Sequence, residues 1–176
     1  MNPTVQTPRL TLRLPGDPDI DRLVLLANDI EVARMLERMP HPYSRSDGEA
    51  WLAGIGGDPG RADFAIDDGS GLIGGLSLRG LDETPVIGYW LGRPYWGRGY
   101  MSEAAAAALG WLFDNHAASA VEARAITENA ASLKVLAKVG FEDAGAAECA
   151  SAACDESQPA RRCLLDRDTF RRLTSA

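Results

Sequence analysis

The amino-acid sequence predicts one α/β domain, spanning residues 1–176, whose helices pack on a single β-sheet. Segments with apolar residues at helical spacing are interspersed with short runs that alternate or are rich in β-branched residues. No internal repeat and no linker long enough to divide the chain is visible. A chain of 176 residues buries roughly 70% of its unfolded surface, so it requires neither a metal nor a disulfide for stability.

Residues 9–14 are expected to form the first strand, because polar and apolar side chains alternate strictly along Arg-Leu-Thr-Leu-Arg-Leu. The Pro, Gly and Asp residues at 15–18 are typical of a turn that ends such a strand. A helix is expected to begin near Asp19, since residues 20–27 place their apolar side chains on one helical face.

Two more helical segments are expected in the first third of the chain. Residues 32–39 form a second apolar stripe, which the prolines just after it would end. Ser46 and Glu49 have the S-x-x-E spacing of a capping box. A third, short helix is therefore expected over residues 50–55, ending at the glycine pair that follows.

From Arg61 onward the pattern changes from helical to strand-like. Three successive antiparallel strands are expected at 62–67, 71–79 and 86–91, because Gly, Pro or Asp residues bound each run. After a glycine-rich turn, apolar residues recur at helical spacing over 101–115. This segment is expected to be a long amphipathic helix.

The last third continues the alternation of strands and helices. A strand is expected at 120–126, followed by a helix that Asn129 caps and Gly140 ends. A further strand is expected directly after Gly140, and another at 161–165, which completes the sheet. Residues 144–158 are small and polar, so they are expected to form a mobile loop.

Charge and composition limit the partners of this chain. The formal net charge is −7, which disfavours nucleic acid as a ligand and mildly favours a cationic amine. No apolar run approaches the roughly 20 residues that cross a bilayer, so no membrane association is expected. The first residues lack the basic and apolar regions of a secretion signal, and the expected location is therefore cytoplasmic.

The cysteines indicate neither a zinc site nor a disulfide framework. Cys149, Cys154 and Cys163 are odd in number and lack C-x-x-C spacing. We expect three reduced thiols and no bound metal.

The turn Gly97-Arg98-Gly99 has the properties of an anion site. It lies between the expected strand 86–91 and the expected helix 101–115. The first N–H groups of a helix have no internal acceptors, and the two glycines allow a phosphate to approach them closely. A pyrophosphate is the expected ligand.

Two other nucleotide-binding motifs can be excluded. A Walker A loop requires a lysine after its second glycine, and none follows Gly97 or Gly99. Residues 69–74 match the dinucleotide pattern G-x-G-x-x-G, but a strand and not a helix is expected after them. We therefore interpret that segment as a hairpin turn.

Three segments give the chain a family resemblance. They are Ile-Gly-Tyr-Trp-Leu at 87–91, Tyr-Trp-Gly-Arg-Gly-Tyr at 95–100, and Asn-Ala-Ala-Ser-Leu-Lys-Val-Leu-Ala-Lys-Val-Gly-Phe at 129–141. The chain resembles the GNAT superfamily of N-acetyltransferases over nearly its whole length, and most closely the RimJ/RimL-like branch. The resemblance implies the GNAT fold, an α/β (α+β) domain with a mixed, mostly antiparallel central sheet. That sheet would have about seven strands, splayed in the middle, with helices on both faces.

The resemblance also implies acetyl-CoA as cosubstrate, without a metal. The cosubstrate would lie between strands 86–91 and 120–126, with its pyrophosphate on the helix start and its pantetheine arm paired with the backbone of Trp90 and Leu91. The Leu91 N–H would polarise the thioester carbonyl as part of an oxyanion hole. The cofactor-binding residues implied in this way are Trp90, Leu91, Trp96, Gly97, Arg98, Gly99, Tyr100, Met101, Ser102, Asn129 and Ser132.

Asn129 and Ser132 each have a structural and a functional interpretation. In the family, the residue at Asn129 contacts the pantetheine arm, and Ser132 would donate a proton or hydrogen bond to the departing thiolate. Without a ligand, Asn129 is a good N-cap and Ser132 an exposed helix residue. Glu103 is interpreted as a favourable charge near a helix N-terminus. Tyr89 and Trp90 are expected on opposite faces of their strand.

The general base is the point at which the sequence departs from the family pattern. Direct attack by a neutral amine requires a proton acceptor, and none of the cysteines lies in a motif that would suggest an acyl-enzyme. Many relatives carry Glu where this chain has Val86. Four carboxylates are alternatives, with Glu83 the leading one, and ordered water is another. The four are Glu83, Asp82, Glu122 and Glu128.

The sequence leaves the acceptor and the assembly open. A protein or peptide N-terminal α-amine is expected, and small amines such as a polyamine, an amino acid or an antibiotic are the alternative. A third hypothesis is a non-catalytic acyl-CoA-binding module. The acceptor site is expected to involve residues 28–45 and 144–160, and the chain is expected to be a monomer or homodimer.

Overall fold

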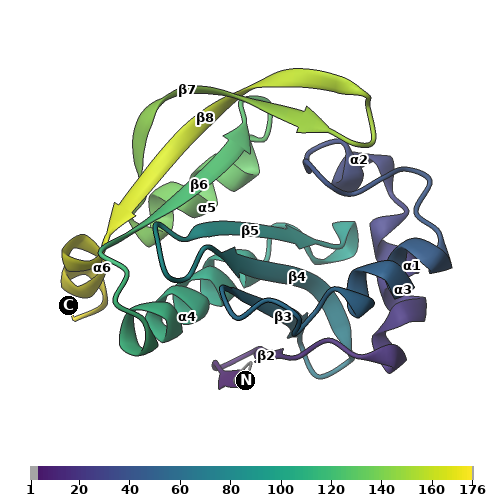
Figure 1. Cartoon of the computed structure of the whole chain (residues 1–176), viewed down its shortest axis with the longest axis horizontal. Helices are drawn as coiled ribbons and strands as arrows, with labels where there is room; N and C mark the ends of the chain where they lie inside the picture. The colour runs from purple at the N-terminus through teal and green to yellow at the C-terminus, as the bar shows by residue number, and fades with distance from the viewer. Residues whose placement is uncertain (1–3, 176) are drawn as a thin grey trace.

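The computed structural model describes residues 4–175 and contains one eight-stranded sheet in the order β1-β2-β3-β4-β5-β6-β8-β7 (Figure 1). The strands are β1 (Val5–Gln6), β2 (Thr11–Arg13), β3 (Arg61–Asp67), β4 (Leu72–Arg79), β5 (Val86–Leu91), β6 (Ala120–Ile126), β7 (Glu142–Ser151) and β8 (Glu156–Asp166). All neighbouring strands are antiparallel except β5 and β6. The predicted mixed, mostly antiparallel sheet is confirmed, with the two-residue β1 as an additional strand.

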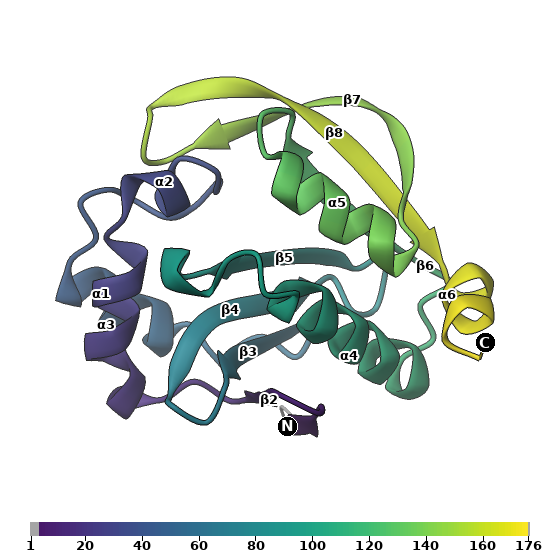
Figure 2. The same ribbon diagram turned by 180° about the vertical axis from the view of Figure 1, so that it is seen from behind.

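Helices lie on both faces of this sheet, as predicted. The helices are α1 (Ile20–Ala27), α2 (Ile30–Ala33), α3 (Arg45–Ala53), α4 (Tyr100–Asn115), α5 (Ala130–Val139) and α6 (Arg167–Thr174), with 3-10 turns at Asp17–Asp19 and Arg93–Tyr95. Figure 2 shows α4 and α5 covering one face and α1 at one end of the molecule. Residues of α1 pack against Ala65 of β3 and Leu72 of β4 on the other face. No helix among residues 4–175 has the length and apolar character needed to cross a membrane.

The side chains of β3, β4 and β5 alternate between two apolar clusters. The larger cluster joins Phe64, Leu76 and Ile87 to buried residues of α4 such as Leu109 and Leu112. The smaller cluster packs residues of α1 against Ala65 of β3, Leu72 of β4 and, at its edge, Trp90 of β5. Burial on both faces explains why these strands have short apolar runs and not a strict alternation.

The segment 144–158 is not the mobile loop that its composition predicts. Residues 142–151 and 156–166 form the long hairpin β7–β8, and β8 also pairs with β6 over residues 160–166. The register shifts between Asp143 and Ala146, where Gly145 has a φ of 120°. The prediction was wrong because backbone pairing between residues 146–151 and 156–161, and not side-chain hydrophobicity, orders this segment.

Two helix predictions in the first third also need correction. The stripe at 32–39 does not form a helix of that length, because α2 ends at Ala33 and irregular turns follow. The third helix begins one turn earlier than predicted. Its capping box is formed by Ser44 and Asp47, whose side chains each accept from the other's backbone N–H, and not by Ser46 and Glu49.

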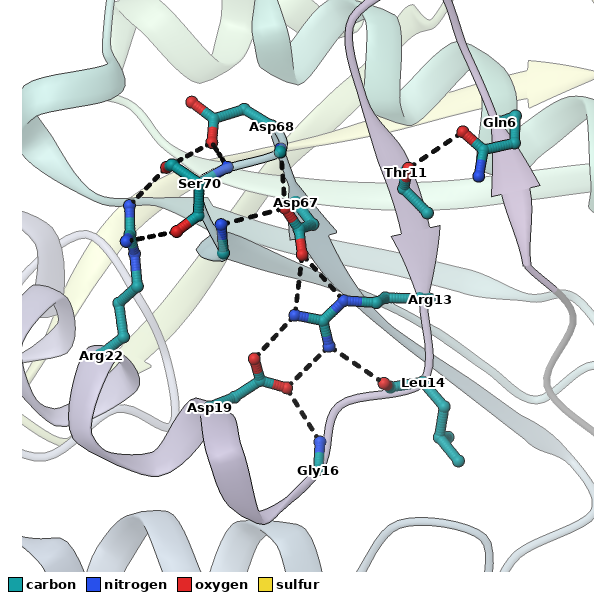
Figure 3. Close-up of polar contacts among 12 residues, drawn as sticks. Gln6, Thr11, Arg13, Leu14, Gly16, Asp19, Arg22, Asp67, Asp68 and Ser70 are labelled. Carbon is teal, nitrogen blue, oxygen red and sulfur yellow. Dashed lines mark hydrogen bonds and ion pairs between the residues drawn. The ribbon is translucent and has the colours of Figure 1, made fainter.

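Arg13 of β2 connects three segments that are far apart in the sequence (Figure 3). Arg13 donates to Asp19 from both terminal nitrogens, at 2.7 and 2.8 Å, and to Asp67 from Nε at 2.9 Å. The backbone N–H of Gly16 also donates to Asp19, at 2.9 Å. Burial alone would raise the pKa of Asp19, but the hydrogen bonds from Arg13 and Gly16 outweigh it and lower that pKa. The cluster therefore holds the N-terminal strand, the end of β3 and the start of α1 together.

Replacing Arg13 by Leu should lower the free energy of unfolding at pH 7 by about 2 to 3 kcal/mol, because Asp19 loses its counter-ion while staying buried. The cost lies below that of a fully buried pair since the Arg13 side chain is 29% exposed. The depressed Asp19 pKa stabilises the fold above the unfolded value of about 3.9, and this contribution is lost as pH falls through the folded value. Urea unfolding at pH 7 and pH 3 measures this effect. The difference in the free energy of unfolding between variant and parent should be smaller at pH 3.

The matched control is Arg45→Leu on α3. Arg45 also pairs with two carboxylates, Asp21 and Glu49, but its side chain is 60% exposed. Its loss should change the free energy of unfolding by no more than about 0.5 kcal/mol. Equal effects of the two substitutions would show that the Arg13 cluster is not a structural tie.

Candidate active site

The central feature of the site is the parting of β5 and β6. These parallel strands pair only at Val86 with Glu122 and at Ile87 with Ala123. Beyond these positions β5 continues against β4, and β6 continues against β8 as far as Ile126. We call the stretch in which residues 88–91 and 124–126 have no mutual pairing the strand separation, and its two sides diverge in Figure 1.

The backbone of β5 presents two residues to the strand separation. In an antiparallel pair, successive residues direct their N–H and C=O groups to alternate sides. The Gly92 N–H donates to the Ile73 carbonyl of β4 at 2.9 Å, so Trp90 also faces β4. Tyr89 and Leu91 therefore face the separation. The Trp90 backbone is not free to pair with a ligand, which corrects the role predicted for it.

Leu91 keeps its N–H but not its carbonyl for a ligand. The carbonyl accepts a hydrogen bond of 2.7 Å from the indole N–H of Trp96. This contact folds the segment after β5 back toward the strand, while Trp96 as a whole stays 46% exposed. Of the sequence-predicted residues, Leu91 thus retains the donor that its predicted role requires, and Trp96 positions the turn.

The glycine turn leads directly into α4, as predicted. Gly97 and Gly99 have φ values of 73° and 76°, in the left-handed region that glycine adopts without strain. A side chain at Gly97 would meet no atom within 4 Å, so the space above the turn is open. The N–H groups of Tyr100, Met101 and Ser102 lie in the first turn of α4 and have no helical acceptors. The buried Met101 side chain belongs to the core, so only its backbone serves this site.

Glu103 fixes the position of this turn. Its carboxylate accepts from the Thr7 hydroxyl at 2.6 Å and from the Arg9 Nε at 2.7 Å, and Arg9 also donates to the Arg98 carbonyl at 2.9 Å. Burial would raise the Glu103 pKa, but the hydrogen bonds from Thr7 and Arg9 dominate and lower it. Glu103 is a structural carboxylate, as its position near the helix start predicts.

Tyr89 and Ser132 meet across the strand separation. Their hydroxyl oxygens are 3.0 Å apart, which links the middle of β5 to the first turn of α5. Asn129 caps that helix by accepting from the Ser132 N–H at 3.1 Å, so its predicted capping role is confirmed. Burial raises the pKa of Tyr89 to about 12, and its hydroxyl is therefore a proton carrier at neutral pH. Sequence alternation places Tyr89 on this face, but only the fold reveals its contact with Ser132.

A hollow of about 430 Å³ adjoins the start of α4. Its lining includes Gly99 and Ser102 of the turn together with the basic side chains of Arg9, Arg98 and Lys138. Glu103 also lines the hollow and pairs with Arg9, so Arg98 and Lys138, beside the unpaired helix N–H groups, form the environment that suits a phosphorylated ligand.

The structure does not bring Glu83 to the strand separation. Asp82 and Glu83 are exposed in the turn before β5, at the end where β5 and β6 are paired. The length of β5, about 17 Å for a six-residue strand, lies between this turn and Leu91. The prediction of Glu83 as a catalytic base is therefore not supported by its position.

The other two carboxylates are engaged by arginines. Glu122 lies beside Val86 but is held by Arg162 at 2.7 Å and Arg124 at 3.0 Å. Burial tends to raise the Glu122 pKa, and these two arginines outweigh it and lower the pKa, so Glu122 is a weak base. Glu128 has a 74% exposed side chain and lies 3.5 Å from Arg34.

The two segments expected to build the acceptor site do come together. The Ala152 N–H in the β7–β8 turn donates to the Glu37 carbonyl at 3.1 Å, and the Ser151 hydroxyl donates to the Arg34 carbonyl at 3.4 Å. The hairpin thus reaches the segment after α2, and both lie at the open end of the strand separation (Figure 1).

Comparison with known proteins adds family information to this geometry. A profile of the acetyltransferase (GNAT) domain matches residues 9–142. A Bacillus licheniformis protein described as uncharacterized N-acetyltransferase p20 is 29% identical over 149 residues, which cover 81% of this chain and 84% of that protein.

Solved structures share the fold at low sequence identity. RimL, described as a ribosomal L7/L12 alpha-N-protein acetyltransferase in complex with coenzyme A, has a TM-score of 0.83 at 17% identity, covering 95% of this chain and 99% of its own. Spermidine N-acetyltransferase from Vibrio cholerae, in complex with CoA and spermine, has a TM-score of 0.79 at 18% identity, with coverages of 93% and 99%. The same fold therefore accommodates a protein acceptor and a polyamine.

Proposed function

Because the chain belongs to the GNAT acetyltransferase family and is thus an acetyl-CoA-dependent N-acetyltransferase, we propose that its acceptor is an α-amine, such as a peptide or protein N-terminus. The observation that best supports acetyl-CoA binding is the parting of β5 and β6 beside the unpaired N–H groups of α4. The proposal of an α-amine acceptor rests on the positions of the four candidate carboxylate bases.

The residues around the strand separation fit acetyl-CoA. The N–H groups of residues 100–102, with Arg98 and Lys138 nearby, would hold its phosphates. The free backbone groups of Tyr89 and Leu91 would pair with its amide-containing arm in the manner of an added strand. Asn129, whose Oδ1 caps α5, would contribute its remaining amide group from the opposite side.

Acetyl-CoA supplies an acetyl thioester: the amine nitrogen bonds to the acetyl carbon, the C–S bond breaks, the amine loses a proton and the thiolate gains one. The Leu91 N–H would stabilise negative charge on the acetyl oxygen. The linked hydroxyls of Tyr89 and Ser132 would return a proton to the thiolate, because the Tyr89 pKa of about 12 keeps the phenol protonated.

An α-amine suits a site at which none of the four candidate carboxylates is both close to the strand separation and free of an arginine partner. Its pKa is about 7.7 to 8.0 against about 10.4 for a lysine side chain. Roughly a third of α-amines but only about 0.1% of lysine amines are therefore neutral at pH 7.5. A proton acceptor as weak as ordered water is then sufficient for the α-amine.

The acceptor class can be tested with matched peptides and acetyl-CoA. One peptide carries a free α-amine and no lysine, and the other has a blocked N-terminus and one lysine, with spermidine as a third acceptor. At pH 7.5 we expect the first peptide to cause thiol release from acetyl-CoA. Mass spectrometry should show that this peptide is acetylated. Turnover confined to the lysine peptide or spermidine would refute the α-amine proposal.

Gly97→Val should raise the KM for acetyl-CoA by about tenfold to a hundredfold. The β-branched side chain cannot adopt the φ of 73° without strain, and it would occupy the open space above the helix start. The estimate corresponds to losing one charge-assisted hydrogen bond to a phosphate. Initial rates over a range of acetyl-CoA concentrations measure this effect.

Gly69→Val is the matched control for that substitution. Gly69 also has a positive φ, 92°, and open space around it, but it lies in the β3–β4 turn. It carries the same backbone strain without affecting the helix start, so its KM for acetyl-CoA should stay near that of the parent. An unchanged KM in Gly97→Val would contradict the placement of the phosphates.

Tyr89→Phe should lower kcat by about tenfold to a hundredfold, at the low end of general acid catalysis, and leave the KM for acetyl-CoA nearly unchanged. Ser132→Ala should have a similar effect, because the two hydroxyls form one hydrogen-bonded unit. The double variant should then be little worse than either single one. Fully multiplicative losses would argue against a shared proton path, and unchanged kcat values would exclude it.

A further inference from the structure

An arginine lies on the sheet where β5 and β6 part, on the face opposite Tyr89. Arg79 of β4 pairs in register with Val86 of β5, and Ser77 pairs with Gly88. A side chain at Gly88 would come within 3.6 Å of both Arg79 Nη2 and Ser77 Oγ. The guanidinium therefore extends over Gly88, the first residue of β5 beyond the paired positions.

The guanidinium of Arg79 has unused hydrogen-bonding capacity. It donates one long hydrogen bond, 3.5 Å, to the Ser77 hydroxyl. Its Nε atom is buried and has no hydrogen-bond partner within residues 4–175. An arginine offers five N–H donors, and buried donors are normally satisfied. The uncharged Val86 stands at the cross-strand position from which a carboxylate could have paired with Arg79.

Other cations surround Arg79. Burial lowers its pKa, and the charges of Arg38 and Arg61 lower it further, against the opposing effects of Asp63 and Glu37. Asp63 already pairs with Arg61 at 2.7 Å. In the next strands on this face, Glu122 is shared by Arg124 and Arg162. The face is thus locally rich in arginine although the whole chain has a net charge of −7.

We propose that Arg79 binds a carboxylate of the acceptor that lies within a few bonds of the α-amine. This inference rests on the proposed function and adds a specificity: the preferred acceptor is an α-amine with a nearby anionic group. The carboxylate could be an acidic side chain at a peptide N-terminus or the α-carboxylate of a free amino acid. A planar guanidinium binds either one through paired N–H donors.

The same arginines would also assist deprotonation. A nearby positive charge destabilises an ammonium group and lowers its pKa, so the neutral amine is favoured. A polyamine gains nothing from Arg79 and is repelled by the arginines around it. The charge distribution on this face therefore reverses the weak preference for cationic acceptors that the overall acidity of the chain predicts.

The test compares acceptors that differ only in the carboxylate. One pair is a peptide beginning with Asp against the same peptide beginning with Asn, and the second is free alanine against alaninamide. Both kcat/KM and calorimetric binding in the presence of CoA are measured. We expect the carboxylate member of at least one pair to be preferred by about tenfold or more, the value of a charge-assisted hydrogen bond. The pair that shows the preference identifies the source of the carboxylate.

Three variants connect this preference to Arg79. Arg79→Gln should reduce it to within about threefold, and Arg79→Lys should retain part of it. Val86→Glu places a carboxylate next to Arg79 at a site that is 40% exposed, so it should weaken the preference without impairing the fold. Arg172→Gln on the exposed surface of α6 is the control and should leave the preference intact. Thermal melting confirms that each variant is folded.

Equal binding and turnover within both pairs, or a preference that survives Arg79→Gln, would overturn the inference. If α-amines are acetylated without any carboxylate preference, the proposed function is supported and the role proposed for Arg79 is refuted. If only spermidine or lysine is acetylated, both the α-amine proposal and the role proposed for Arg79 are refuted. If no amine is acetylated, binding of the Asp and Asn peptides still decides the role of Arg79.

Discussion

β5 and β6 pair at only two positions, and the backbone groups beyond those positions must find other partners. Buried N–H and C=O groups are rarely left unsatisfied. The Leu91 carbonyl is satisfied by Trp96, whereas the Leu91 N–H and the Tyr89 backbone face the strand separation. The first N–H groups of α4 present the same requirement a few residues later. A ligand with a peptide-like arm and a phosphate at one end would satisfy both sets, which is why the parting of two strands organises the donor site.

The surroundings of this separation are connected by hydrogen bonds where the donor would bind. Glu103, Arg9 and Thr7 fasten the glycine turn to the N-terminal segment, and Asn129 fixes the start of α5 opposite β5. The acceptor side is built differently. In the site proposed here it would combine the segment after α2, the turn of the β7–β8 hairpin and the arginine-rich sheet face around Arg79. In the proposed function, donor recognition would thus depend mainly on backbone groups, and acceptor recognition on side-chain charge.

Local patterns predicted most of the fold because local energetics determine it. The strands at 62–67, 71–79, 86–91 and 120–126 and the long helix after Gly99 agree with the structure within a residue or two. Positive φ at Gly97 and Gly99 and the Asn129 cap are properties of a few consecutive residues. The failures involve longer-range effects. The segment 144–158 is ordered by pairing between the two strands of the β7–β8 hairpin, and the stripe at 32–39 forms no helix of that length.

The sequence by itself determined the elements of the proposed donor site: the strand, the glycine turn, the helix start and the cap that follow one another along the chain. Only the tertiary structure decided which groups face the strand separation. Pairing with β4 turns the backbone groups of Trp90 toward β4 and leaves those of Tyr89 and Leu91 facing the strand separation. Packing across the sheet joined Tyr89 to Ser132, held Glu122 between two arginines and kept Glu83 at the far end of β5. Charges interact through space and not along the chain, so the acceptor side could not be predicted from the order of residues.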